Sequence, residues 1–403
     1  MLVQPTLRAA LLAAAALCAL AGAAAATATP DELGLASQAH HNAWREGMLT
    51  GSAAAGAGRG RHMLVDLAAI PEKPGLSDEV DIGIITAFSP EVQSVLDRMD
   101  SILGKKTYSG RAFFIGKLGK KTVAVTTSGE SMVNAALTTQ LFCDKFVSKL
   151  VFSGIAGGVD PSNNIGDVVI PATWIQPHQQ RYIRPLESSK YFYYPGKGAT
   201  ITDDTFKQLA SGEYASFTRP GTDQCTASLS LAKLAAYKKS GVVTTGFALP
   251  IPVQILTSGL DIFKGTVPAK FNIYVDPGLL ATAKKVASTV KLSRSYTVPG
   301  TNTTFTLGTI PKIKVGGVGM SSSTFVDNAE YRKDLYETLK AESCDMESTA
   351  FIQVCATNKK ACIVIRSLSD LAGGDADGNQ VSNFFGLASY HSSLVLTALV
   401  KAA

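Results

Sequence analysis

The chain has 403 residues, of which 46% are hydrophobic and 17% are charged, and it carries a formal net charge of +6. This composition is that of a globular protein and excludes a disordered or fibrous chain; at about 150 residues per domain, the length allows one large domain or two. Lysines and arginines are spread along the sequence without a basic block, so nucleic acid is not expected as a partner.

Residues 1–26 are predicted to be a secretory signal peptide. Arg8 precedes an Ala/Leu run from Ala9 to Leu20, and small residues near Ala25 offer cleavage positions. An organelle transit peptide would carry more arginine and hydroxyl residues. No later segment reaches about 18 uninterrupted apolar residues, so no membrane association is expected once the leader is removed. We expect an extracellular or vacuolar protein.

Residues 27–78 are expected to form a flexible lead-in, because Gly, Ala and Pro dominate and no hydrophobic period persists. The histidines in it, His40, His41 and His62, have no carboxylate or cysteine at ligand spacing. The cysteines that follow the leader are odd in number and lack C-x-x-C spacing. Neither a metal site, a cofactor nor a disulfide framework is therefore expected.

The main domain is predicted to run from residue 79 to residue 403. Its first apolar run, 82–88, suits a buried strand, and Ser89-Pro90-Glu91 then gives a helix start with Ser89 as N-cap. Further strands are predicted over 111–116, 122–127 and 150–152, and a helix over 132–146. The third of these strands begins at 150–152 and ends in 153–158, where the glycine-rich stretch 154–158 is expected to form a loop. Strands alternating with helices indicate an α/β fold with its site along one sheet edge.

Residues 176–312 are predicted to be a long insertion. The stretch is punctuated by Pro and Gly and holds a tyrosine cluster around 182–194, with helix candidates only at 229–239 and 277–290. The core pattern returns at 316–320, followed by a helix over 327–340. The insertion either shapes substrate access or covers the sheet, and the sequence leaves both open.

Two carboxylates near the C-terminus lie at element ends, where side chains converge on ligands. Glu347 is placed where a helix begins, and Asp370 follows an apolar β-branched run that Arg366 interrupts. Ser367 and Ser369 flank the same strand end. A charged residue inside a buried strand needs polar partners, so these residues predict a polar pocket.

Six blocks in order carry a family resemblance: IGIITAFSPEV, TTSGESMVNAA, SGIAGGVDPSNNIGDVVIP, SSTFVDNAEYRKDL, CDMESTA and VIRSLSDLAGG. The chain resembles the purine nucleoside phosphorylase and uridine phosphorylase superfamily, and within it the methylthioadenosine/S-adenosylhomocysteine nucleosidases and the plant bark and vegetative storage proteins. The resemblance implies a three-layer α/β sandwich around a mixed, partly barrel-like sheet. It also implies a homo-oligomer that acts on a purine nucleoside, with adenine as the expected base.

The resemblance assigns roles to the site residues. Asp370 would protonate the purine as general acid, oriented by Ser369. Glu347 would accept hydrogen bonds from the ribose hydroxyls, and Met346 would pack against the sugar. The aromatic side chains would line the base pocket, with Phe325 stacking on the purine and Phe88 at the end of the first strand.

Glu91 indicates whether water or phosphate is the nucleophile. Phosphorylases bind phosphate through basic side chains and backbone amides after the first strand, whereas this chain has Ser89-Pro90-Glu91 there. Glu91 matches the carboxylate with which the nucleosidases activate water, and Ser128 and Arg366 match its partners. Hydrolysis is therefore favoured.

Alternatives remain open at this level. Glu91 is also what the first turn of a helix prefers, and Phe325 could be a core residue. A phosphate-dependent phosphorylase, with phosphate as a second ligand, is the alternative reaction. A storage protein that keeps the fold without turnover is the alternative of another class, although Met346 and Glu347 are both retained.

Overall fold

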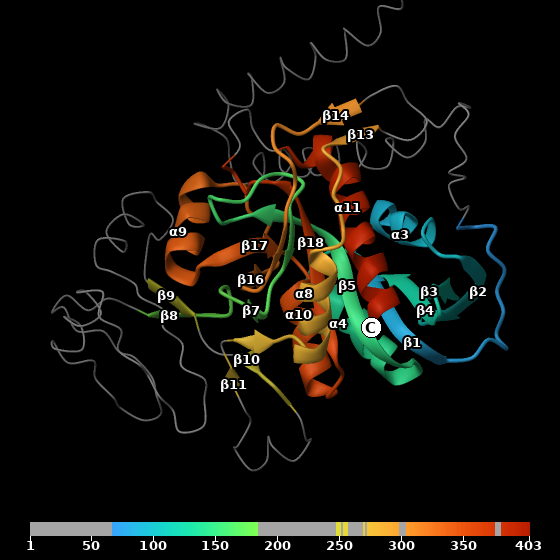
Figure 1. Ribbon diagram of the computed structural model, residues 1–403. Helices are drawn as coiled ribbons and strands as arrows, with labels where there is room; N and C mark the ends of the chain where they lie inside the picture. Colours follow the sequence, from blue (N-terminus) through green and yellow to red (C-terminus); the bar gives the residue numbers. More distant parts are fainter. Residues whose placement is uncertain are drawn as a thin grey trace, which may run out of the picture. The chain divides into compact units, whose positions relative to one another are not determined.

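The computed structural model describes residues 67–183, 247–250, 253–256, 269–270, 272–297, 304–374 and 380–403 (Figure 1). These residues belong to one compact unit, Gly58–Ala403. Its centre is a mixed sheet whose longest path runs β12-β7-β16-β17-β5-β1-β4-β3-β2, while β18, β6 and β15 branch from β5. Its strands are β1 (Glu79–Thr86), β2 (Ser101–Tyr108), β3 (Arg111–Leu118), β4 (Lys121–Thr127), β5 (Val147–Gly158), β6 (Val168–Ile170), β7 (Thr173–Ile175), β12 (Ile273–Tyr274), β15 (Ile313–Val315), β16 (Val318–Ser321), β17 (Ala341–Asp345) and β18 (Cys362–Asp370).

Four neighbouring strands of the sheet are parallel, and Asp370 ends one of them. β4, β1, β5 and β18 lie side by side in one direction. β18 is buried at every position, in keeping with the apolar, largely β-branched run 362–365 at its start. β5 is long enough to pair with β1 along its first half and with β17 through Gly157 and Gly158. The carboxyl ends of these parallel strands therefore meet at one edge.

Helices pack against this sheet. α11 contacts β18, β5 and α3, and α4 contacts α10 (Figure 1). The arrangement confirms the predicted α/β class with a mixed central sheet. The described helices are α3 (Ser89–Leu96), α4 (Ser131–Lys145), α8 (Pro277–Ala287), α9 (Ala329–Leu339), α10 (Ser348–Thr357) and α11 (Val381–Ala402).

Two local predictions are wrong. Ser89 is not the N-cap of α3, because Phe88 takes that position and Ser89 begins the helix. The side chain of Glu91 accepts the backbone N–H of Phe88, but the N-cap residue itself makes no side-chain hydrogen bond to the first turn. The glycine-rich stretch 154–158 is not a loop, because β5 continues through Gly158. Pairing with β18 and β17 outweighs the low strand propensity of glycine there.

The predicted insertion, 176–312, is described in part. Within it, β12 pairs antiparallel with β7, and α8 contacts α11 and β15. The short pairs β8 (Gln180–Ile183) with β9 (Phe247–Pro250), β10 (Val253–Gln254) with β11 (Ala269–Lys270), and β13 (Ser295–Thr297) with β14 (Thr304–Thr306) lie outside the main sheet. The helix candidate 229–239 and most of the tyrosine cluster lie outside the described residues.

The N-terminal predictions fall mostly beyond the described residues as well. The leader, His40, His41 and His62 are among those not described, whereas the last residues of the predicted lead-in are. There, Ile70 is buried and Lys106 of β2 donates to Asp78 at 2.6 Å. Within the described part of the chain, no helix combines the length and apolar character that crossing a membrane requires.

Candidate active site

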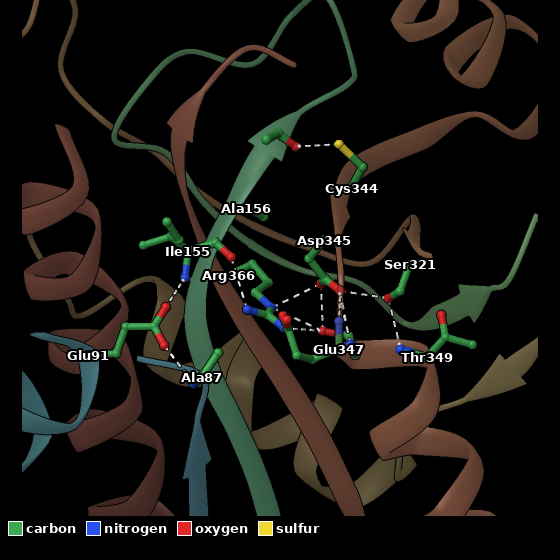
Figure 2. Close-up of polar contacts among 12 residues, drawn as sticks. Ala87, Glu91, Ile155, Ala156, Ser321, Cys344, Asp345, Glu347, Thr349 and Arg366 are labelled. Carbon is green, nitrogen blue, oxygen red and sulfur yellow. Dashed lines mark hydrogen bonds and ion pairs between the residues drawn. The ribbon is translucent and has the colours of Figure 1, made fainter. Parts of the chain in front are cut away.

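Four predicted site residues lie around β5 and β18, and Figure 2 shows three of them, Glu91, Glu347 and Arg366. Arg366 and Asp370 lie on β18 and are fully or almost fully buried. Glu91 reaches in from the first turn of α3, which follows β1, and Glu347 sits at the junction of β17 and α10. These positions lie at the sheet edge where the sequence predicts a site.

Arg366 is the centre of this network. Its Nη2 donates to Glu347 Oε2 at 3.2 Å, and its Nε forms an ion pair with Asp345 Oδ2 at 3.0 Å. Nη1 donates to the carbonyl of Ile155 at 2.9 Å, and Nε and Nη2 both reach the hydroxyl of Ser348. The guanidinium also lies 4.6 Å from the ring centroid of Phe152. Such saturation of its donors allows a buried strand to hold a cation.

Glu91 is buried and accepts three backbone N–H groups. Its Oε2 accepts from Ala87 at 2.8 Å and Phe88 at 3.1 Å, and its Oε1 accepts from Ile155 at 2.8 Å (Figure 2). Burial raises the pKa of Glu91, while the nearby Arg366 charge and the three N–H groups oppose that rise. The carboxyl is thus held in fixed orientation with a pKa above its ordinary value.

Gly154 allows Glu91 and Arg366 to approach each other. It pairs with Arg366 in the register of β5 and β18. A Cβ atom at Gly154 would lie 2.5 Å from Glu91 Oε1 and 2.8 Å from Arg366 Nη1. Any side chain at this position would displace one of the two groups, so the glycine is required by close approach.

Glu347 takes the N-cap position of α10 and faces two partners. Its Oε1 accepts the N–H of Ser131, the first residue of α4, at 2.8 Å, and its Oε2 pairs with Arg366. Burial raises the pKa of Glu347 to about 7; Arg366 opposes the rise, and the negative charges of Asp345 and Glu91 add to it. The group therefore titrates near neutral pH.

Asp345 belongs to the network but was not among the predicted site residues. Its Oδ1 accepts from the hydroxyl of Ser321 at 2.7 Å and from the amides of Glu347 and Ser348 at 3.0 and 2.9 Å. It thereby orients the start of α10, and with it Glu347. The signal was present in the sequence, since an Asp two residues before Glu347 is a candidate helix cap.

Asp370 ends β18 and has its own set of contacts. Its Oδ2 accepts from the hydroxyl of Ser369 at 2.9 Å, and its Oδ1 accepts the N–H of Ala372 at 2.8 Å. A Cβ on Gly157 would lie 3.1 Å from Asp370 Oδ1. The carboxyl is buried at the strand end, among hydrogen-bond donors.

The remaining predicted residues lie around these groups. Ser128 is buried, and its hydroxyl lies 2.7 Å from the carbonyl of Gly129 and 3.2 Å from that of Thr86, the last residue of β1. Phe88 packs edge-on against Phe385 of α11, with centroids 5.6 Å apart. Met346 is half-buried between Asp345 and Glu347. Phe325 is not a core residue, because it is 47% exposed in the segment between β16 and α9.

Among the residues that the structure describes, no three His, Cys, Asp or Glu side chains are grouped to hold a metal ion. The carboxylates and the guanidinium at the site are paired with one another, with hydroxyls and with the backbone, whereas the buried hydroxyls of Ser153 and Ser367 have no hydrogen-bond partner within the described residues. The arrangement offers a fixed, buried carboxylate (Glu91), a carboxyl that titrates near pH 7 (Glu347) and a strand-end carboxyl with a serine partner (Asp370). These are the components of acid–base chemistry on a polar substrate.

Comparison with known proteins places the chain in a family. The model of the phosphorylase superfamily matches residues 81–403. The 5'-methylthioadenosine/S-adenosylhomocysteine nucleosidase of Staphylococcus epidermidis is 25% identical over 79% of this chain and 99% of its own length. The corresponding protein of Pseudoalteromonas translucida is 39% identical over 23% of this chain, and that match spans 39% of the relative.

A solved structure has the same fold. The 5'-methylthioadenosine/S-adenosylhomocysteine nucleosidase of Neisseria meningitidis, in complex with methylthio-immucillin-A, superposes with a TM-score of 0.50 and 18% identity. The match covers 81% of this chain and 100% of the other. The chain belongs to the phosphorylase superfamily, a superfamily of enzymes, as its six sequence blocks predict.

Proposed function

We propose that the protein hydrolyses the N-glycosidic bond of a purine nucleoside. The observation that carries this proposal is the charge balance of the buried network. One guanidinium, that of Arg366, faces three carboxylates, Glu91, Asp345 and Glu347. A site with excess negative charge accommodates neutral water and a developing positive charge on the ribosyl ring better than a phosphate dianion.

Each acid has a separate part in the proposed reaction. Asp370 gives its proton to the purine as the glycosidic bond breaks, and Ser369 and the amide of Ala372 hold it in place. Water attacks the anomeric carbon and loses a proton to Glu91, so the products are the free base and the free sugar. The raised pKa of Glu91 makes it a stronger base than an exposed glutamate.

The sugar is proposed to bind at Glu347. Its carboxylate accepts hydrogen bonds from ribose hydroxyls, while Arg366 and the amide of Ser131 fix its orientation. Met346 packs against the sugar. Phe325 and Phe88 contact the base, and the exposure of Phe325 suits a side chain that a ligand covers.

Adenine is the proposed base. The relatives that align over most of their length are named for 5'-methylthioadenosine and S-adenosylhomocysteine. The 5' substituent is tested by comparing adenosine, 5'-methylthioadenosine and S-adenosylhomocysteine as substrates. A preference for a thioether substituent would mean that this protein shares the substrates for which those relatives are named.

The decisive experiment measures adenine release from these nucleosides with and without phosphate. We expect release at the same rate in both buffers, with free sugar as the second product. Release that depends wholly on phosphate, with a sugar 1-phosphate as product, would overturn hydrolysis and favour a phosphorylase. Purified protein that is inactive on the whole panel would favour the storage hypothesis.

Location and assembly are proposals of the same kind. We propose that residues 1–26 direct the chain into the secretory pathway and that the mature protein is a homo-oligomer. Expression of the full chain in eukaryotic cells, followed by N-terminal sequencing of secreted or vacuolar protein, should give a start near residue 27. Light scattering of that material gives the oligomeric state, and a monomer would contradict the second proposal.

A further inference from the structure

His178 joins the two ends of the loop that carries Phe325. It lies three residues beyond the end of β7, at the same sheet edge as Glu347. Its Nδ1 is 3.2 Å from the hydroxyl oxygen of Thr324, and its Nε2 hydrogen-bonds to the hydroxyl of Tyr331. The imidazole also stacks on the ring of Tyr331, with centroids 5.7 Å apart and planes 19° apart. The side chain of His178 thus links the first and last residues of the segment 324–331.

The same segment is tied to the site at its two ends. Before Phe325, the hydroxyl of Ser323 is 2.8 Å from that of Ser131, whose amide holds Glu347. After it, the amide of Asn328 donates to the carbonyl of Ala372 at 3.2 Å. The amide of Ala372 in turn holds Asp370. The loop therefore spans the groups that fix the two acids.

Gly373 permits the close approach at the second of these ties. Its φ is +89°, and a Cβ there would lie 2.2 Å from the backbone nitrogen of Asn328. A residue with a side chain would push the loop away from the end of β18. The loop is thus held at one end by the contact of Ser323 with Ser131 and at the other by the contact of Asn328 with Ala372.

An imidazole suits the closing position chemically. In its neutral form one ring nitrogen donates and the other accepts, and a hydroxyl can meet either. Burial lowers the pKa of His178, which keeps the ring neutral. A glutamine offers a donor and an acceptor at similar reach, whereas a leucine fills the space without either.

We propose that His178 is a positioning residue for the purine, because its bonds to Thr324 and Tyr331 hold the loop in the shape that presents Phe325 to the base. This inference rests on the proposed function, in which Phe325 contacts the purine. His178 itself touches neither the sugar nor the reacting bond. Its loss should therefore weaken binding of the base in the ground state and transition state alike.

The test compares His178→Leu and His178→Gln with wild type in adenine release. For His178→Leu we expect KM to rise roughly 3–10-fold, the size of a lost aromatic contact, with kcat changed less than about 2-fold. His178→Gln should recover most of the wild-type KM. His391→Gln is the control for the loss of a histidine elsewhere, because His391 is fully buried and its Nδ1 lies 2.9 Å from the carbonyl oxygen of Gly166; the KM of this variant should stay at the wild-type value.

A double-mutant cycle separates positioning from general damage. In a Phe325→Leu background the His178→Leu change should have little further effect on KM, since both changes remove the same contact. An unchanged KM in His178→Leu, or an equal rise in both backgrounds, would overturn the proposal.

Adenine binding by calorimetry provides a readout that needs no turnover. If the wild type cleaves no nucleoside but binds adenine, and His178→Leu weakens that binding only when Phe325 is present, positioning stands and the hydrolytic function falls. Equal adenine affinity in the variant and the wild type, or no adenine binding by an inactive wild type, would overturn the positioning role.

Discussion

Glu91 and Arg366 both hydrogen-bond to the backbone of one residue of β5, Ile155. Glu91 accepts the N–H of Ile155 at 2.8 Å, and Arg366 donates to the carbonyl of Ile155 at 2.9 Å (Figure 2). The two side chains come from α3 and β18, which are far apart in the sequence. Ile155 thereby holds the carboxylate of Glu91, which is proposed to activate water, close to the guanidinium of Arg366.

Replacing Arg366 with methionine should destabilise the fold by about 3–5 kcal/mol, because three buried carboxylates would lose their cation. The pKa values of Glu91 and Glu347 should rise further, since Arg366 lowers both. Urea denaturation measures the first effect.

Lys314→Met is the control for that change. Lys314 contacts Asp160 and Glu342 at 3.4 Å, but its side chain is 29% exposed, so solvent screens these pairs. We expect a loss below about 1 kcal/mol. Equal losses in the two variants would show that burial does not set the importance of Arg366.

Gly154→Ala tests the close approach of Glu91 and Arg366. A methyl group there would displace one of them, so we expect base release to fall roughly 100-fold and stability to fall by about 1–3 kcal/mol. At Gly308, in contrast, a Cβ meets nothing within 4 Å. Gly308→Ala should leave both quantities close to wild type, and full activity in Gly154→Ala would refute the steric argument.

Glu347→Gln should change how stability depends on pH. The folded pKa of Glu347 is raised from 4.5 to about 7, so the folded state binds its proton more tightly than the unfolded state between these values. Stability of the wild type relative to the variant should therefore fall as pH rises through this window and level off above it. From pH 5 to pH 8 the fall should be on the order of 2–3 kcal/mol. A pH-independent difference in unfolding free energy would contradict a raised pKa.

Glu91→Gln and Asp370→Asn should each lower kcat by at least about 100-fold without making the reaction depend on phosphate, because each removes one proton-transfer group. Asp276→Asn is the matched carboxylate-to-amide control. Asp276 caps α8 through the N–H of Leu279, and its own amide bonds the carbonyl of Cys362, at the opposite end of β18 from Asp370. Asparagine caps helices equally well, so its kcat should match wild type. Wild-type kcat in either site variant would remove that residue from the mechanism.

Local sequence was a good guide wherever a pattern was complete within a few residues. The β-branched run of β1, the helix start at Pro90 and the periodic stretch of α4 are all present close to their predicted bounds. The same reasoning failed at 154–158, because glycines indicate a loop unless neighbouring strands pair with them. Two partners, β17 and β18, do so here.

By itself, the sequence determined the superfamily, the α/β class and the element ends at which Glu91, Glu347 and Asp370 lie, because these depend on short ordered motifs and local periodicity. Only the tertiary structure decided that Asp345 orients Glu347, that Gly154 makes room for two charges, and that His178 closes the loop around Phe325. Those relationships join residues far apart in the chain. They arise from sheet register and from the need to satisfy buried polar groups, which no local pattern records.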